Sequence, residues 1–404
     1  MRILHTSDWH LGQHFMGKSR QAEHQAFIAW LLEQVRSHGV DALIIAGDVF
    51  DTGAPPSYAR EQYNALVLAL REAGCALVVL AGNHDSPAVL GESRSLLAQL
   101  GAQVVPGVMA DPAEQVLVLN ERSGAPGAIF CAIPFLRPRE LIVSSAGQSA
   151  HDKQQSLQQA IAEHYQTLFE HAHALREQLA LRLPIIASGH LTTVGASASE
   201  SVREIYVGSL EAFPTSAFPP ADYIALGHIH RPQKVGGLEH IRYCGSPIAL
   251  SFDEARLDKQ VLLVDFADGA LSEITPLTVP CFQPMVSVSG SLKELAGLIL
   301  QAAAQGNRTQ PVWLDVQVSQ DDYLSDLHQQ VAALCEGLPV EVLRLRRTRH
   351  QAQLALAAEA QETLDELSLE DVFARRLQGE VLDADLSRQL CDLYRDVVQT
   401  LEQP

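Results

Sequence analysis

Five short polar motifs in this 404-residue chain bring together carboxylate, imidazole and amide side chains. Four of them directly follow a short apolar stretch that is typical of a buried strand. The five motifs are Asp8-Trp9-His10, Gly47-Asp48-Val49-Phe50-Asp51, Gly82-Asn83-His84-Asp85, Gly189-His190 and Gly227-His228-Ile229-His230. Carboxylate oxygens, imidazole nitrogens and amide oxygens are the ligands that a pair of divalent cations takes in proteins. The residue types therefore predict a metal site.

Each motif is weak when it stands alone. Asp-x-His recurs by chance in a chain with 16 histidines, Gly-Asn-His-Asp is usually a turn, and a histidine after a strand is more often a hydrogen-bonded core residue than a ligand. Together the motifs are more specific, because open α/β sheets place their sites in the loops that leave the carboxyl ends of strands. We therefore expect one site to be formed by Asp8, Asp48, Asn83, His190 and His228.

Alternating strand and helix patterns account for the first part of the chain. Apolar stretches at 3–4, 42–46 and 76–80 are predicted strands, and amphipathic stretches at 21–37 and 57–73 are predicted helices. Short apolar strands that alternate with helices indicate a sheet covered on both faces. Further predicted elements are a long helix at 153–181 and strands at 115–119, 128–133, 185–187, 223–226, 241–244 and 260–266. The prediction is an α/β fold in which two sheets form a sandwich flanked by helices.

Prolines mark a predicted boundary after this part of the chain. Pro276, Pro280 and Pro284 precede a new strand and helix pattern that begins near 285 and 292. The predicted domains are a catalytic domain at 1–275, a small α/β domain at 280–345 and a helical region at 351–404. A basic stretch, 344–349, lies between the last two.

The last region is acidic and has the pattern of a helical pair. Over 351–404 it carries twelve acidic residues against four arginines, a net charge of −8. Ser368 and either Asp383 or Asp385 are predicted helix starts, and the apolar residues of the second helix recur at i, i+4 and i+7. Two interpretations stay open, since this apolar stripe either packs on its own chain or docks on a partner. The predicted docking residues are Phe373, Leu377, Leu386, Leu390, Tyr394 and Val397.

Composition limits the class of protein. A net charge of −19 argues against broad electrostatic binding of nucleic acid. The six cysteines show no Cys-x-x-Cys spacing, so a metal must be held by nitrogen and oxygen ligands. The N-terminus lacks a signal-peptide pattern, and no stretch approaches 18 uninterrupted apolar residues. We therefore expect a cytoplasmic protein with no membrane partner.

The order of the five motifs resembles that of the calcineurin-like metallophosphoesterases. The resemblance is closest to the SbcD family, the nuclease subunits of bacterial SbcCD DNA-repair complexes. It is carried by four longer matches, which span residues 5–12, 46–51, 82–87 and 225–232. The resemblance is strong over residues 1–270, and the remainder is similar in architecture. The resemblance implies a two-sheet metallophosphoesterase sandwich, a small capping domain that positions DNA, and a C-terminal helical pair that docks on a partner.

The resemblance also implies the ligands of two divalent cations, with Mn²⁺ expected. The first cation would be held by Asp8, His10, Asp48 and His230. The second would be held by Asp48, Asn83, His190 and His228. Asp48 would bridge the two, because one carboxylate offers two oxygens.

Three further side chains have implied roles near the cations. His84 is the implied catalytic residue, which lies over the phosphate and stabilises charge or protonates the departing oxygen. Asp51 and Asp85 either orient imidazoles through a ring N–H or cap turns.

The implied activity is two-metal hydrolysis of DNA phosphodiesters, as an exonuclease on double-stranded ends and an endonuclease on single strands and hairpins, in repair, recombination and replication. The implied partners are an SbcC-type, SMC-like ATPase, DNA at the nucleoid, and a second copy of the chain in a heterotetramer. The basic stretch 344–349 either contacts DNA or is a solvated linker face. The acidic balance predicts weak DNA binding by this chain alone. Two alternatives stay open, namely a phosphodiesterase for small molecules and a scaffold with an inactive nuclease fold.

Overall fold

The computed structural model describes residues 1–142, 149–199, 201–202, 212–319 and 327–347, together with residues 390, 393 and 394. These residues divide into two compact units. The first unit contains Met1–Ser287, Ala302–Asp315 and Pro339–Arg344. The second contains the described residues of Val288–Gln301, Val316–Leu338 and the chain from Leu345 onward.

The first sheet has six strands in the order β14-β13-β1-β4-β5-β6. Its parallel strands are β1 (Arg2–Thr6), β4 (Ala42–Ala46), β5 (Ala76–Leu80) and β6 (Ala102–Val105), and its antiparallel strands are β13 (Gln260–Ala267) and β14 (Ala270–Thr278). The helices and short strands connected to it are β2 (His14–Phe15), β3 (Lys18–Ser19), α1 (Gln21–Ser37), α2 (Ser57–Glu72), α3 (Pro87–Gly91) and α4 (Arg94–Gln99). The predicted bounds of α1, β4 and β5 are those of the structure.

The second sheet also has six strands, in the order β11-β12-β10-β9-β8-β7. These strands are β7 (Val116–Asn120), β8 (Pro126–Cys131), β9 (Ile185–His190), β10 (Tyr223–Gly227), β11 (Gln233–Val235) and β12 (Leu238–Tyr243). Its helical segments are η1 (Pro112–Gln115), α5 (Pro138–Leu141), α6 (Ala150–Leu179), η2 (Thr215–Ala217) and η3 (Phe252–Glu254). Ser149 is the N-cap of the long helix α6, and its hydroxyl accepts from the Asp152 N–H at 3.1 Å. Such a cap stabilises the start of a helix.

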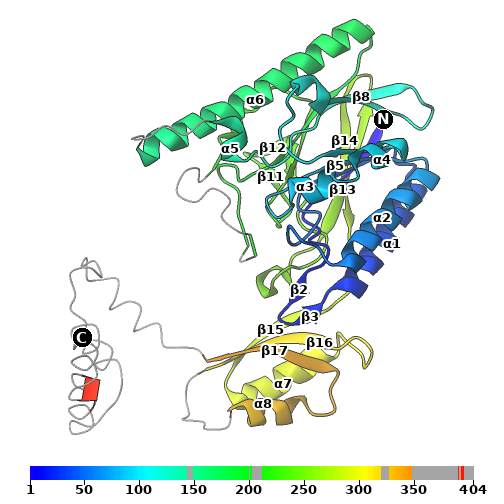
Figure 1. Ribbon diagram of the computed structural model, residues 1–404. Helices are drawn as coiled ribbons and strands as arrows, with labels where there is room; N and C mark the ends of the chain where they lie inside the picture. The colour runs from blue at the N-terminus through cyan, green and yellow to red at the C-terminus, as the bar shows by residue number, and fades with distance from the viewer. Residues whose placement is uncertain are drawn as a thin grey trace. The chain divides into compact units, whose positions relative to one another are not determined.

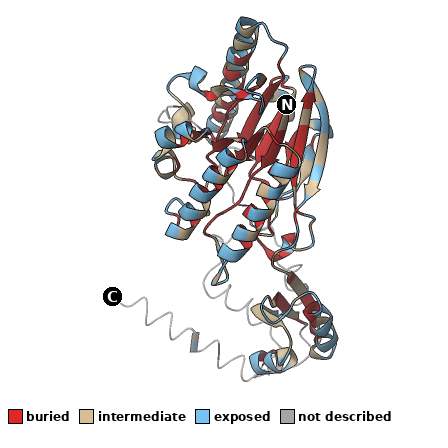
Figure 2. Cartoon of the chain, turned by 90° about the vertical axis from the view of Figure 1, so that its right-hand side faces the viewer, coloured by how far each residue is buried: buried red, intermediate tan, exposed pale blue. Residues whose placement is uncertain are grey.

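The two sheets pack face to face, and helices cover both outer faces. Alternate residues of β1, β4 and β5 point to opposite faces, so Ile44 lies in the core between the sheets while Leu43 and Ile45 pack against α1 and α2. Apolar residues of α6 cover the outer face of the second sheet. Figure 1 shows α1 and α2 side by side, and Figure 2 shows the buried strands between partly exposed helices. The predicted two-sheet α/β sandwich is confirmed.

A third sheet, in the order β15-β16-β17, follows the sandwich in the chain. Its strands are β15 (Met285–Gly290), β16 (Val312–Val318) and β17 (Val340–Arg347), and its helices are α7 (Leu292–Ala303) and α8 (Leu327–Cys335). The limits of the three predicted domains stay predictions. Near the first limit, β14 continues to Thr278, and Pro276 lies within this edge strand, where a missing N–H is tolerated.

The basic stretch contains an arginine that is used inside the protein. Both nitrogens Nε and Nη2 of Arg344 donate to the Asp315 carboxylate, at 2.9 and 2.8 Å. The guanidinium also lies over the Phe252 ring, 5.4 Å from its centre. Arg344 therefore has a structural role, whereas Thr348 and Arg349 lie outside the described residues.

Most of the predicted docking residues also lie outside the described part of the chain, namely Phe373, Leu377, Leu386 and Val397. Leu390 and Tyr394 are helical and partly exposed. Among the described residues, no helix is both long and apolar enough to cross a membrane.

Candidate metal centre

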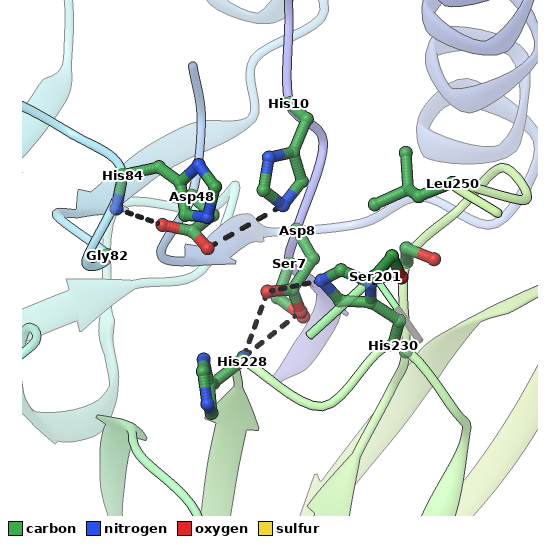
Figure 3. Close-up of polar contacts among 12 residues, drawn as sticks. Ser7, Asp8, His10, Asp48, Gly82, His84, Ser201, His228, His230 and Leu250 are labelled. Carbon is green, nitrogen blue, oxygen red and sulfur yellow. Dashed lines mark hydrogen bonds and ion pairs between the residues drawn. The ribbon is translucent and has the colours of Figure 1, made fainter. Parts of the chain in front are cut away.

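Seven predicted ligands meet at the carboxyl ends of strands from both sheets. The first sheet supplies Asp8 and His10 after β1, Asp48 after β4 and Asn83 after β5; the second supplies His190 at the end of β9, and His228 and His230 after β10. Strands β1, β4 and β5 are parallel, as are β9 and β10. Their ends therefore meet at one edge, and Figure 3 shows Asp8, His10, Asp48 and His230 near one another there, with His228 beside them.

The loops that carry the ligands are held to one another by backbone hydrogen bonds. The Asp8 N–H donates to the Gly47 carbonyl, and the His10 N–H donates to the Asp48 carbonyl, both at 3.0 Å. Four of the predicted ligands adopt a positive φ, a backbone conformation that is costly for residues other than glycine. They are Asp8 (55°), His10 (50°), Asp48 (50°) and His228 (91°). Such strained backbone persists only where its surroundings hold it in place.

Two glycines leave room for the ligands. A Cβ at Gly47, where φ is +97°, would lie 2.1 Å from Nδ1 of His190. A Cβ at Gly82 would lie 2.1 Å from Oδ1 of Asp48 and 2.3 Å from its backbone nitrogen. Neither position can accept a side chain unless a ligand moves.

We expect Gly82→Ala to lower activity about 100-fold, because a ligand displaced by about 1 Å costs that much. The melting temperature and the Mn²⁺ affinity should fall in parallel with activity. The matched control is Gly297→Ala in α7, where the added methyl meets no atom within 4 Å. A Gly82→Ala protein with the Mn²⁺ affinity of the parent chain would contradict the steric argument.

The ligand atoms form two adjoining groups. Asp8, His10 and His230 make one group and Asp48, His190 and His228 the other, with the atoms of each group within 4.8 Å of one another. Within the same limit, His84 forms a further group with His10 and Asp48. Asp48 lies between them, since its Oδ2 is 3.6 Å from Nε2 of His10 and 3.3 Å from Nε2 of His190. The Asp48 carboxylate is thus within reach of both groups.

Three imidazoles are oriented in the same way. Nδ1 of His10 contacts the Asp51 carboxylate at 3.2 Å, Nδ1 of His190 contacts the Ala46 carbonyl at 2.9 Å, and Nδ1 of His230 contacts the Glu254 carboxylate at 3.1 Å. A carbonyl or an ionised carboxylate only accepts, so each Nδ1 carries the proton. Each Nε2 is then the nitrogen that faces Asp8 or Asp48.

The remaining donors fit a pair of cations. Within the described chain, Nε2 of His10 and Nε2 of His228 are buried without a hydrogen-bond partner, and a buried polar atom without a partner calls for an explanation such as an ion. Oδ1 of Asn83 lies 2.9 Å from Nε2 of His190 and 3.2 Å from Nδ1 of His228. Nitrogen and oxygen donors of these types suit Mn²⁺, Zn²⁺ or Fe²⁺.

His84 lies beside this pair of sites. Its backbone N–H donates to Oδ1 of Asp48 at 2.9 Å, and its Nδ1 contacts the Asp51 carbonyl at 2.7 Å. Its ring meets the His10 ring edge-on, with the ring centres 4.5 Å apart. His84 is partly exposed whereas the predicted ligand histidines are buried, so its position is compatible with contact to a substrate.

The two acidic residues with open roles differ in their contacts. Asp51 binds the His10 ring, as expected of a carboxylate that orients an imidazole. Asp85 accepts from the backbone N–H groups of Gly82, Val49 and Phe50, at 2.9 to 3.1 Å. Those are the contacts of the turn-capping interpretation, and they fasten the loop after β5 to the loop after β4. Burial, and then the nearby Asp48 carboxylate, raise the pKa of Asp85 to about 6.

Three residues behind His230 were not predicted from the sequence. Glu254, which is fully buried, contacts the His230 ring, and it is itself bound by Lys259 and Ser201. No motif marks them. Glu254 ends the one-turn helix η3, Lys259 follows it just before β13, and Ser201 comes from a distant segment of the chain.

Opposite charges face each other in the centre. Burial would lower the pKa of His190, but the Asp48 carboxylate at 3.3 Å raises it to about 9. Burial would raise the pKa of Asp48, yet His190 and His10 hold it well below its usual range. For His228, burial and the neighbouring His190 lower the pKa well below its ordinary value. His190 and Asp48 are therefore a charged pair at neutral pH.

A cation must displace the proton from Nε2 of His190. Because that proton is bound below about pH 9, we expect the Mn²⁺ affinity to rise with pH through the neutral range, by up to about tenfold per unit for one displaced proton. Calorimetric titrations with Mn²⁺ at pH 7 and pH 8 measure this slope. His190→Ala should lose most of this dependence of the Mn²⁺ affinity on pH. Equal Mn²⁺ affinities of the parent chain at pH 7 and pH 8 would contradict the prediction.

Comparisons with known proteins agree with this geometry. The family model described as calcineurin-like phosphoesterase matches residues 1–232, and the model described as the type 5 capsule protein repressor C-terminal domain matches residues 281–381. The chain is 54% identical to the SbcD subunit of the nuclease SbcCD from Escherichia coli strain K12, over 99% of this chain and 98% of the relative. The proteins of the same name from Rhodobacter capsulatus and Bacillus subtilis strain 168 are 35% and 30% identical, over 93% and 80% of this chain and 94% and 81% of their own.

Proposed function

Because this chain belongs to the calcineurin-like phosphoesterases and, among them, to the SbcD family of SbcCD nuclease subunits, we propose that it is a metal-dependent DNA nuclease. The proposed activities are exonuclease action on double-stranded ends and endonuclease action on single strands and hairpins. They would serve DNA repair, recombination and replication at the nucleoid in the cytoplasm.

The observation that carries the proposal is the common orientation of His10, His190 and His230. In each ring, Nδ1 donates a hydrogen bond to an oxygen behind the ring, and Nε2 faces a carboxylate. Nitrogens that are fixed in this way are ready to bind cations without rearrangement. When bound, two divalent cations supply Lewis-acid chemistry to phosphodiester hydrolysis.

The residues of the two half-sites have separate proposed roles. We assign one cation to Asp8, His10, Asp48 and His230. We assign the other to Asp48, Asn83, His190 and His228. Mn²⁺ is the proposed metal, and the donor types support a hard or borderline cation of this kind.

His84 is the proposed catalytic residue. Since its Nδ1 donates to the Asp51 carbonyl, the neutral ring has its lone pair on Nε2. Only the imidazolium form can then donate a proton from Nε2 to a departing sugar oxygen. The same charged form would stabilise negative charge on the phosphate.

The rest of the chain suggests assembly with partners. The relatives are named as subunits of SbcCD, so we propose an SbcC-type ATPase as the partner, in a heterotetramer with two copies of this chain. We propose that a capping domain at 280–345 is followed by a docking segment; the family match at 281–381 covers the first and reaches into the second. With a net charge of −19, this chain would depend on that partner for much of its DNA affinity.

One experiment separates this proposal from its alternatives. The purified chain with Mn²⁺ is given a blunt linear duplex, with and without the ATPase and ATP, beside a small phosphodiester. If the chain digests the duplex, and the ATPase with ATP increases this digestion, the result supports the nuclease proposal. Hydrolysis of only the small ester favours the phosphodiesterase alternative, and metal binding without any hydrolysis favours the scaffold.

A further inference from the structure

The two halves of the metal centre differ in what lies behind their histidines. On the Asp8 side, both rings are backed by carboxylates, His10 by Asp51 and His230 by Glu254. On the other side, His190 is backed by the Ala46 carbonyl. A carboxylate behind an imidazole makes the ring a stronger metal ligand. The Asp8 side is therefore the side on which carboxylates hold the rings from behind.

Glu254 is the more enclosed of the two backing carboxylates. The Glu254 side chain is fully buried, whereas the Asp51 side chain is 23% exposed. Oε1 of Glu254 binds the His230 ring and the hydroxyls of Ser199 and Ser201. Its Oε2 accepts from the Leu250 N–H at 3.1 Å and from the Lys259 ammonium at 2.6 Å. Both oxygens are thus fixed by donors.

The hydrogen bonds also fix the tautomer of His230. Ser201 has one hydroxyl proton, and its contact with Glu254 uses it, because the carboxylate only accepts. The same hydroxyl oxygen must then accept from Nδ1 of His230, which lies 2.7 Å away. Nδ1 therefore carries the ring proton, and Nε2 keeps its lone pair on the side of Asp8.

Lys259 holds the other end of the same histidine. Its buried ammonium donates to Oε2 of Glu254, to Oγ of Ser246 at 2.7 Å and to the His230 carbonyl at 3.2 Å. All three ammonium protons are used in this way. The Lys259 ammonium thus neutralises the Glu254 carboxylate behind the ring and also anchors the backbone of His230.

We infer that Glu254 is a positioning residue for the Asp8 side of the metal centre, where it holds the His230 ring and its tautomer, and that Lys259 keeps Glu254 in place. This inference rests on the proposed function, because it assumes that the centre binds divalent cations. The buried ion pair of Glu254 and Lys259, which belongs to none of the sequence motifs, would thus control the affinity of one of the two cation sites.

Titration with Mn²⁺ tests the inference without any nuclease assay. Glu254→Gln keeps the shape of the side chain but removes its charge, and we expect one of the two binding steps to weaken about 10- to 100-fold. The other step should stay unchanged. In a His190→Ala background, which disables the opposite side, Glu254→Gln should weaken the remaining site by the same factor.

The matched control is Glu23→Gln, which removes another buried carboxylate, paired with Arg20. It should bind Mn²⁺ as the parent chain does. Lys259→Gln should weaken the same step as Glu254→Gln, and the double variant should lose no more than Glu254→Gln alone. Two unchanged binding steps in Glu254→Gln would overturn the inference, while a parent chain that binds no cation would overturn the proposed function instead.

A measurement on the parent chain covers the case in which Glu254→Gln does not fold. Long-range ¹H–¹⁵N spectra of the metal-free chain report which nitrogen of each imidazole is protonated. His230 should carry its proton on Nδ1. A proton on Nε2 of the neutral ring would refute the inferred role of Glu254.

Discussion

Asp48→Ala is expected to lose both cations and to reduce DNA hydrolysis at least about 1000-fold, which corresponds to about 4 kcal/mol of transition-state stabilisation. Asp48 is the carboxylate between the two groups of ligands, 3.6 Å from His10 and 3.3 Å from His190. Removal of its carboxylate takes away the oxygen ligand that the two groups of predicted metal ligands would share. Metal analysis of the dialysed protein, together with a nuclease assay, measures both losses.

The control for this variant must also lose a buried carboxylate. Asp315→Asn meets this condition, because Asp315 is buried and binds Arg344. It should retain the metal content of the parent chain. Full metal content in Asp48→Ala would show that Asp48 does not bridge the sites.

His84→Ala is expected to retain both cations while its turnover falls about 100- to 10,000-fold, the usual contribution of a general acid. Nδ1 of His84 is bound to the Asp51 carbonyl, and its partly exposed ring lies against His10. The change should therefore appear in kcat more than in KM. Metal analysis and steady-state kinetics on a duplex substrate measure the two properties separately.

Added imidazole gives a further readout for His84. If the lost ring acts chemically, imidazole in the buffer should restore part of the turnover of His84→Ala and none of that of Asp48→Ala. A His84→Ala variant with the kcat of the parent chain would exclude His84 from catalysis, and one without metal would make it a ligand.

The sequence was sufficient to predict the convergence of Asp8, Asp48, Asn83, His190 and His228, for a local reason, while His10 and His230 were implied by the family resemblance. Each of them lies within a few residues of the end of an apolar strand, so the position of each depends on a short segment. Parallel strands then bring the segments to one edge. For the same reason, the strands at 42–46 and 76–80 and the helix at 21–37 could be predicted to the residue.

Features that depend on distant contacts could not be predicted. Glu254 lies in a one-turn helix with no pattern of its own, and only the folded chain brings it to His230. Asp85 has the same residue type as Asp51, yet it binds three backbone N–H groups instead of a ring. Pro276 suggested a break in the chain, but an edge strand accommodates it. In each case the contact partner, not the residue type, decides the role.

The division of the ligands between the two sheets links cation binding to the integrity of the sandwich. Neither sheet has a complete set of donors, so a cation can bind tightly only after the sheets have docked during folding. Each bound cation then favours the docked state by mass action. Chelators should therefore make the nuclease fold easier to unfold and to digest with proteases, and the supply of divalent metal in the cell would help to set the lifetime of the protein.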